Sequence, residues 1–434
     1  MKKILPFLVI TTLFVLIGRG VLFTLSWIAV KHGGVDVSIV AATYWWSYVV
    51  GLPVLGALGD LKRQRAMLLI AALANSAAVI LVAVLAHRHA PIDLRLMLPE
   101  LAVVALMFAI VNPLAGKILY RHTRQEQIRM AFKAKGWLDS IASFSAPAIG
   151  GWLIYGVGEA NALACYATAG VVLLGAALTQ FRDEPQGEAE HRPAATGIAS
   201  GLADFVKGAR IVVRVKTELR LAIYMMILNF TITPFLTVVL PVYVGQTMNK
   251  SSYDLGMIAS GFGIGMVIGG LLVLALHGVS RNLNIPISVG GILLIALGFL
   301  GCALFGSTLA LAVCLALAGT GVALFNGVIT AQRAIAIPDD VRSKFESFML
   351  FSTSLSIPIG ALAAGHAMQM VTVSALTVGF AVLALLMVPL LIVGIPRYGD
   401  LMRAHEGVRP PFYLRSYPTA FDGLSTSNLT RGET

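Results

Sequence analysis

The chain has 434 residues, of which 57% are hydrophobic and 12% are charged; its mean hydropathy is +0.84 and its net charge is +11 at pH 7. A soluble chain carries about a quarter charged residues, so this composition excludes an ordinary soluble protein and indicates that lipid surrounds most of the chain. The basic residues form no stripe interleaved with aromatic residues, which argues against a nucleic-acid partner and favours loops that face anionic lipid.

The first half of the chain contains six apolar stretches that are long enough to cross a bilayer, which takes about 20 residues. The first of them follows Met1-Lys2-Lys3 and runs to Val30, too long for a signal peptide, and no cleavage site follows it, so we expect an uncleaved span. The six predicted spans are 5–29, 38–59, 67–86, 98–119, 131–155 and 162–181.

A polar stretch at 182–218 separates these spans from a second set. It begins as a linker rich in Glu, Gly and Ala, and ends in a basic amphipathic segment from Phe205 to Lys216, which predicts a helix on the membrane surface. The second set of predicted spans is 221–245, 254–277, 285–305, 309–331, 345–369 and 373–395. The residues after Pro396 are polar and include Pro410-Pro411, so we expect a disordered or loosely attached tail.

The predicted fold is therefore an all-α membrane protein with about twelve transmembrane helices in two groups of six. Its parts are an N-terminal bundle (1–181), a linker with an amphipathic helix (182–218), a C-terminal bundle (219–396) and a tail (397–434).

The 32 Lys and Arg residues are distributed very unevenly between the two sides of the predicted membrane. Most fall on the side that holds both termini and the central linker. The opposite side has Lys31, Arg88, Arg95 and Lys250. Positively charged loops stay in the cytoplasm, so we expect both termini to be cytoplasmic, in a bacterial inner membrane.

The two halves share a pattern of residues at equal spacing. Asn112-Pro113, Arg129 and Pro147 to Gly150 recur as Asn326-Gly327, Arg342 and Pro358 to Gly360, at offsets of 214, 213 and 211 residues. Parallel repeats of this kind are the plan of one large class of transporters, although similarity by chance between two apolar helices is an alternative.

The loop between spans two and three reads Gly56-Ala-Leu-Gly-Asp60-Leu-Lys-Arg-Gln-Arg65. With the six-plus-six helices and the long central loop, it resembles the major facilitator superfamily, whose signature here is Gly-x-x-x-Asp-Arg-x-Gly-Arg-Arg. Gly56, Asp60 and Arg65 match, whereas the other signature positions do not. The resemblance implies that Asp60 and Arg65 help to latch the cytoplasmic face, near Arg342 to Glu346 at the start of span eleven. An ordinary charged turn is the alternative.

The turns before spans five and eleven contain Arg129 and Arg342, and each precedes a helix with a mid-membrane proline and glycine. This arrangement resembles the branch of the superfamily that holds macrolide exporters, exporters of enterobactin and other siderophores, and lysophospholipid carriers. The resemblance implies export of a mid-sized amphipathic molecule, with Arg129, Arg342 and Glu346 at the cytoplasmic gate.

Ionisable residues inside a membrane are costly, which makes them candidates for function. Arg19 lies near the middle of span one between two glycines, and Asp139 is the acid at comparable depth, in span five. In the superfamily these spans are neighbours, so we predict that the two residues pair. Protonation of Asp139 would then break the pair and couple transport to protons. A static ion pair that fixes helix packing is an equal alternative.

Other polar residues are candidates for the wall of a central cavity, because spans one, four, seven and ten line it in this superfamily. Asn112, Asn229 and Asn326 would hydrogen-bond substrate or bridge helices. Lys117 lies near the cytoplasmic end of span four, where it would snorkel to the interface or bind an anionic group.

The chain has no motif typical of an enzyme or of a cofactor. Cys165, Cys302 and Cys314 form no metal-binding pattern, and there is no nucleotide-binding lysine motif. We therefore expect a monomeric secondary transporter that exports a small amphipathic organic molecule by proton antiport, without metal or cofactor. Lipid flipping, solute uptake and a non-transporting membrane sensor are the alternatives.

Overall fold

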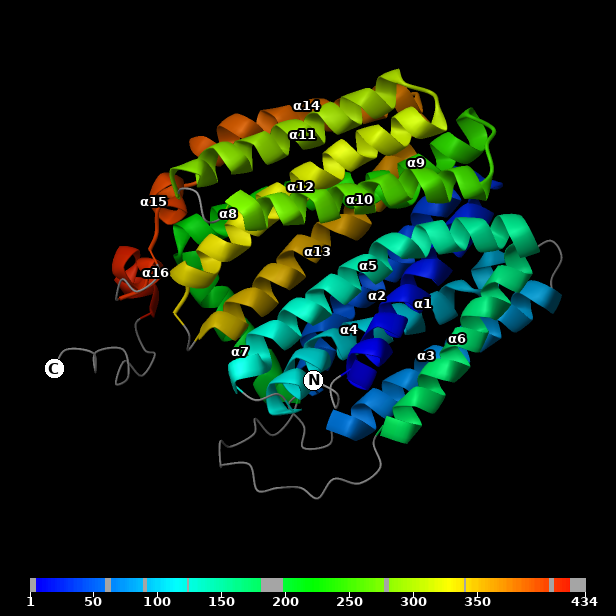
Figure 1. Cartoon of the computed structure of the whole chain (residues 1–434), viewed down its shortest axis with the longest axis horizontal. Coiled ribbons are helices and arrows are strands. Elements are labelled where there is room, and N and C mark those ends of the chain that lie inside the picture. Colours follow the sequence, from blue (N-terminus) through cyan, green and yellow to red (C-terminus); the bar gives the residue numbers. More distant parts are fainter. Residues whose placement is uncertain are drawn as a thin grey trace.

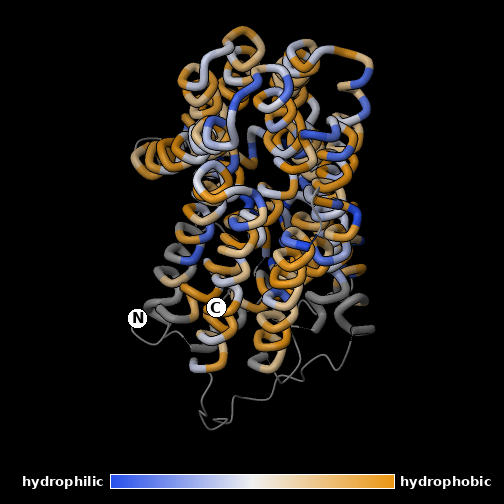
Figure 2. Tube along the Cα trace, turned by 90° about the vertical axis from the view of Figure 1, so that its right-hand side faces the viewer, coloured by the Kyte–Doolittle hydropathy of each residue, from blue (hydrophilic) through white to orange (hydrophobic). Residues whose placement is uncertain are grey.

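A computed structural model of the chain describes residues 5–58, 64–88, 92–122, 125–180, 198–276, 281–338, 341–405 and 410–421. Within these residues no strand is formed, and twelve helices are long and apolar enough to cross a membrane. Hydrophobic residues predominate along these helices (Figure 2). The fold is therefore the predicted all-α membrane protein.

The first six spans form one bundle, on the lower right of Figure 1. Buried side chains such as Phe14, Leu25 and Tyr44 fill its core. The helices follow the predicted order, although α5 begins at Gln125, within the stretch expected to be a loop. Their bounds are α1 (Leu5–Val30), α2 (Gly34–Leu58), α3 (Gln64–Arg88), α4 (Leu98–His122), α5 (Gln125–Val157) and α6 (Glu159–Gln180).

The second bundle contains the other six spans, and the seventh span is irregular. It consists of α8 (Lys216–Pro234), η2 (Phe235–Val239), α9 (Leu240–Val242) and η3 (Tyr243–Thr247), of which η2 and η3 are π-helical. Pro234 and Pro241 lack the N–H that an α-helix needs at those positions, so the four-residue spacing of the backbone hydrogen bonds gives way locally to the five-residue spacing of a π-helix. The remaining spans are α10 (Ser252–Leu276), α11 (Asn284–Leu304), α12 (Thr308–Ala336), α13 (Arg342–Ala367) and α14 (Val373–Ile392).

The two bundles meet through α10 on α5 and through α13 on α2. Both contacts use residues without a Cβ: a Cβ at Gly151 would overlap the carbonyl oxygen of Ser252, and one at Gly365 would overlap Oγ of Ser38. Small residues allow helix backbones to approach closely in a membrane. These positions lie at the end of the molecule that carries the α1–α2 turn. We call it the opposite end, because the central amphipathic helix lies at the other one.

The predicted amphipathic helix is present as α7 (Ile198–Arg214). It lies across the other end of the molecule, which we call the α7 end, and contacts both α2 and α13. Phe205 packs against Phe351 and Phe348, with ring centroids 5.2 and 6.0 Å apart. The prediction that this helix rests on the membrane surface therefore missed its main contacts, which are with both bundles.

The prediction of a disordered or loosely attached tail is wrong for residues 397–405 and 410–421. This segment forms α15 (Tyr398–Met402), α16 (Phe412–Ser416) and η6 (Pro418–Phe421), which lie against the α7 end of the second bundle (Figure 1). Tyr413 and Phe421 are buried and stack on Phe345 of α13, each at a centroid distance of 6.3 Å. Burial of these aromatic rings holds the segment in place.

Candidate functional site

A cavity of about 590 Å³ lies between the two bundles. Side chains from α1, α2 and α5 line one side, and side chains from α8, α10, α12 and α13 line the other. Most of the wall is apolar or aromatic; Phe144 and Phe262 meet across the α5–α10 contact, with ring centroids 6.0 Å apart. Pockets of this size and character accommodate drug-sized organic molecules.

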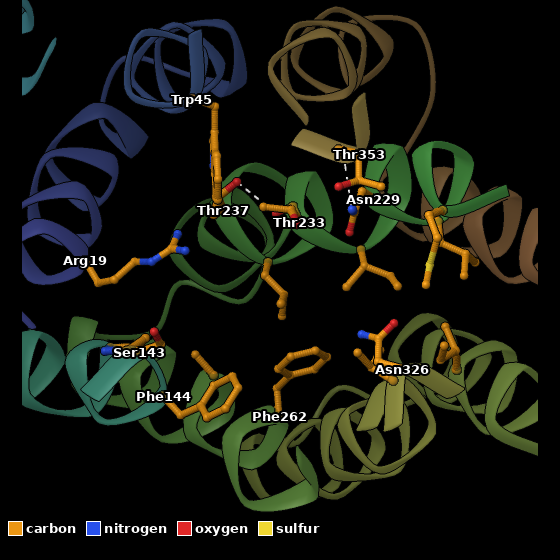
Figure 3. A pocket seen from close by; sticks show the side chains of 18 of the residues that line it. Arg19, Trp45, Ser143, Phe144, Asn229, Thr233, Thr237, Phe262, Asn326 and Thr353 are labelled. Carbon is orange, nitrogen blue, oxygen red and sulfur yellow. Dashed lines mark hydrogen bonds between the residues drawn. The ribbon is translucent and has the colours of Figure 1, made fainter. Parts of the chain in front are cut away.

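Arg19 reaches into this cavity from the middle of α1, as Figure 3 shows. Its guanidinium carbon lies 4.8 Å from the ring centroid of Trp45 and 5.8 Å from that of Tyr44. Its Nε is buried without a hydrogen-bond partner. The adjacent Gly20 leaves space for the ring of Tyr166, which a Cβ would overlap. Among the described residues, the site thus holds this cation against aromatic faces and against no carboxylate.

The predicted pair of Arg19 and Asp139 is not formed. Asp139 pairs instead with Lys135, one turn earlier on the same helix, with Oδ2 at 2.5 Å from Nζ. The other carboxylate oxygen of Asp139 is buried without a partner. Similar depth in the membrane was the basis of the prediction, but depth does not determine which face of a helix a side chain occupies.

Uncharged polar residues also line the cavity, as predicted for Asn229 and Asn326. The side-chain amide of Asn229 donates to the carbonyl oxygen of Thr353 at 3.3 Å and so joins α8 to α13. The side chain of Asn326 projects from α12 toward the cavity (Figure 3). Asn229 therefore acts as a helix bridge in this conformation, whereas Asn326 is available to a ligand.

Trp45 belongs to a cluster of aromatic residues formed by α2 and α4. Its ring lies edge-on to those of Tyr44 and Tyr48, at centroid distances of 5.6 and 5.7 Å, and Tyr48 stacks on Phe108 at 5.4 Å. Tyr44 and Tyr48 are packing residues, and among these rings Trp45 is the one that lines the cavity.

A buried ion network lies at the α7 end of the cavity, and our sequence analysis missed it. Arg333 of α12 donates from Nε and Nη2 to Oε1 of Glu218, at 2.7 and 2.5 Å, and from Nη1 to Glu346 at 3.3 Å. The other oxygen of Glu218 accepts from the hydroxyl of Tyr413 at 2.6 Å. The network joins α8, α12, α13 and α16. The signal for it was a charge just outside each of spans seven and ten, of which the prediction used only Arg333, in the distribution of Lys and Arg.

The predicted gate is described in part. Glu346 belongs to the ion network and lines the cavity, and Arg342 donates to the carbonyl oxygen of Ala334 at 2.7 Å. Asp60 lies outside the described residues. The side chains of four other predicted site residues also lie outside them, although each residue is in a helix: Arg65, Asn112, Lys117 and Arg129.

Two helix bundles around a central cavity of mixed polar and apolar lining are the architecture of a multi-pass membrane carrier. The family model of the Major Facilitator Superfamily matches residues 8–332, and the chain belongs to that superfamily. It is therefore a transporter for a small molecule. No curated protein matches the chain in sequence.

Solved structures of other transporters share the fold. The nucleoside transporter NupG has 16% identity to the chain and a TM-score of 0.67, with 93% of this chain and 100% of that chain covered. A POT family transporter in complex with 5-aminolevulinic acid has 14% identity and a TM-score of 0.69, with coverage of 90% and 96%. A D-xylose-proton symporter has 13% identity and a TM-score of 0.64, with coverage of 91% and 99%. At these identities the likeness is one of fold.

Proposed function

We propose that this transporter exports a small amphipathic organic molecule that carries a negative charge, such as a drug-like compound or a siderophore, by alternating access and proton antiport. The observation that carries the proposal is the position of Arg19 in the cavity, over Trp45 and with no carboxylate partner among the described residues. The resemblance to macrolide and siderophore exporters supports the same direction and substrate class.

The charges of the cavity favour an anion. Among its described lining residues the charged ones are Arg19, Arg333 and Glu346, and Arg333 is neutralised by Glu218 and Glu346. A cation that is partly removed from water loses hydration energy, which a bound anion restores. The aromatic and aliphatic remainder of the wall suits the apolar body of an amphipathic molecule.

The close contacts at the opposite end support alternating access. There the glycines at 151 and 365 bring the bundles together, whereas the cavity extends in the other direction to Arg333 and Glu346. If both termini are cytoplasmic, as the distribution of Lys and Arg indicates, this conformation receives substrate from the cytoplasm. Rocking of one bundle against the other would then expose the same cavity outside a bacterial inner membrane.

Two carboxylates are candidates for proton coupling. Asp139 pairs with Lys135, and Glu346 pairs with Arg333 at the edge of the cavity. Protonation of either carboxylate would weaken its ion pair and remove one negative charge, which changes the charge of the cavity or of its gate. We therefore expect Asp139→Asn or Glu346→Gln to abolish proton-driven export while substrate exchange at equal pH continues. Undiminished proton-driven export in both variants would remove these residues as coupling sites.

The central test is flux in proteoliposomes, with a panel of organic molecules that have the same aromatic body and a negative, neutral or positive group. We expect transport of the anion, reduced about tenfold or more by Arg19→Gln, which corresponds to the loss of about 1.4 kcal/mol of binding, and reduced less by Arg19→Lys. Asn326→Ala serves as a matched cavity variant that retains the cation.

The outcomes separate the alternatives. Preference for the cation or the neutral compound, or equal transport by Arg19→Gln, would overturn the anionic substrate class. Accumulation only inward would indicate an uptake carrier, and movement only of labelled lysophospholipid would indicate a lipid carrier. Binding without flux of any compound would indicate a sensor.

A further inference from the structure

The C-terminal segment forms a second cavity, separate from the central one. It has a volume of about 380 Å³ and lies between α15, α16 and Ile335 near the end of α12. The side chains of Arg397, Arg403 and Arg415 line it, together with His405 and Asp400. Neither the transport cycle nor the ion network uses this cavity.

The described residues that line this second cavity carry a net positive charge. Three guanidinium groups face a single carboxylate among the described lining residues, and Asp400 forms no ion pair with any described residue. Like charges that line one cavity repel one another, and a bound anion relieves the repulsion. Arginine binds phosphate groups well because its planar fork donates two parallel hydrogen bonds.

Arg397 is held in place by specific contacts. Its guanidinium carbon lies 5.5 Å from the ring centroid of Tyr417, and its Nη1 donates to the carbonyl oxygen of Ser416 at 3.3 Å. Its backbone is left-handed, with φ 55° and ψ 27°, a conformation that costs free energy in a residue with a Cβ. The fold therefore keeps a cation at this position against a local cost, as binding sites often do.

The cavity follows directly on a surface that lipid would cover. The end of α14, a candidate membrane span, exposes Leu390, Ile392 and Val393, and Arg397 comes a few residues later. In Figure 1 α15 lies beside this end of α14, and α16 lies below α15. A phosphate in the cavity would thus sit at the depth of lipid headgroups, with an apolar surface beside it for acyl chains.

We propose that this cavity binds a phosphate group, carried by an anionic phospholipid. The α16 helix contributes Arg415 to the cavity and Tyr413 to the ion network with Glu218. Bound lipid would hold α16 on the bundle, and through Tyr413 it would stabilise the network that joins α8 to α12. The site therefore links the lipid composition of the membrane to the α7 end of the transport cavity.

The test uses the full chain, purified in detergent and stripped of lipid. Short-chain phosphatidylglycerol, short-chain phosphatidylcholine and inorganic phosphate are each titrated, with matched chloride as the control for ionic strength. We expect phosphatidylglycerol to raise the midpoint of thermal unfolding saturably by about 2–4 °C or more. The shift should vanish in the double variant Arg403→Gln/Arg415→Gln and persist in Arg403→Lys/Arg415→Lys.

The matched control removes two exposed arginines at the opposite end, in the double variant Arg88→Gln/Arg95→Gln, which should respond as the unmodified chain does. An equal shift with inorganic phosphate, lost in the Arg403→Gln/Arg415→Gln variant, would support the phosphate site and assign it to the free ion. No saturable shift with either probe, equal shifts with phosphatidylcholine, or an undiminished shift in the Arg403→Gln/Arg415→Gln variant would overturn the proposal.

Discussion

Replacement of Arg333 by glutamine would leave the carboxylate of Glu218 buried without its cation. The side chain of Glu218 is fully buried and that of Arg333 is 6% exposed. Of the three hydrogen bonds that the structure gives this carboxylate, two come from Arg333 and one from Tyr413. The variant therefore removes the counter-charge and most of the donors at once.

The expected magnitude follows from this burial. Removal of one partner from a buried ion pair costs about 3–5 kcal/mol, because the remaining charge is left without solvent or partner. The pair of Lys31 and Glu159 gives the comparison, since Lys31 is 62% exposed. Loss of an exposed pair of this kind changes stability by about 0–1 kcal/mol.

The assay is unfolding in detergent for four forms: the unmodified chain, Arg333→Gln, Lys31→Gln and the double variant Glu218→Gln/Arg333→Gln. We expect a loss of about 3–5 kcal/mol for Arg333→Gln and a smaller loss for the double variant, which buries no net charge. Equal losses for Arg333→Gln and Lys31→Gln, or a double variant that is less stable than Arg333→Gln, would refute the reasoning.

Two further changes address the tail and the opposite end. Burial raises the pKa of Tyr413 well above its ordinary value of 10.0, and the carboxylate of Glu218 raises it further. The neutral phenol of Tyr413 therefore stabilises the fold fully below about pH 10, and this stabilisation is lost as the pH rises toward the folded-state pKa. Tyr413→Phe should therefore flatten the fall of the unfolding midpoint above about pH 10. Gly365→Trp should force α13 away from Ser38 and open the opposite end, because even a Cβ at position 365 overlaps Ser38. A maleimide applied from that end should then label Ser26→Cys in the cavity faster.

Each of these two changes has its own control. Parallel pH profiles for Tyr413→Phe and the unmodified chain would contradict the assigned role of the phenol. Gly306→Trp is the matched variant at the opposite end, because a Cβ at Gly306 meets no atom within 4 Å. Equal labelling of Ser26→Cys in the Gly365→Trp and Gly306→Trp backgrounds would argue that the α2–α13 contact does not close that end.

The twelve spans were predictable because a bilayer demands long apolar helices whatever their neighbours are. The amphipathic pattern of α7 was equally clear, but its contacts with α2 and α13 depend on the complete fold. The prediction of a disordered or loosely attached tail relied on its prolines and polar residues. Its aromatic residues, Phe412, Tyr413 and Phe421, were the signal for packing.

The residues of the candidate site could be predicted from their type and position, but the partners of these residues were predicted less well. Arg19 stood out as a charge within a span, and it does line the cavity. Its contact with Trp45 and the pairing of Asp139 with Lys135 depend on how each helix is rotated, which the apolar pattern of a membrane helix specifies poorly when most of its faces are hydrophobic. The network of Glu218 and Arg333 joins residues 115 positions apart and required the tertiary structure.

The hydrogen bond from Tyr413 to Glu218 joins residues 195 positions apart, which bears on how the chain is made. During synthesis Glu218 enters the membrane region long before Tyr413 leaves the ribosome, so one oxygen of its carboxylate has to await the final helices. A chain that stops before Tyr413 contains all twelve spans yet leaves that oxygen without its phenol donor. The buried ion network between the helices is thus complete only when residues that follow the last span have been made.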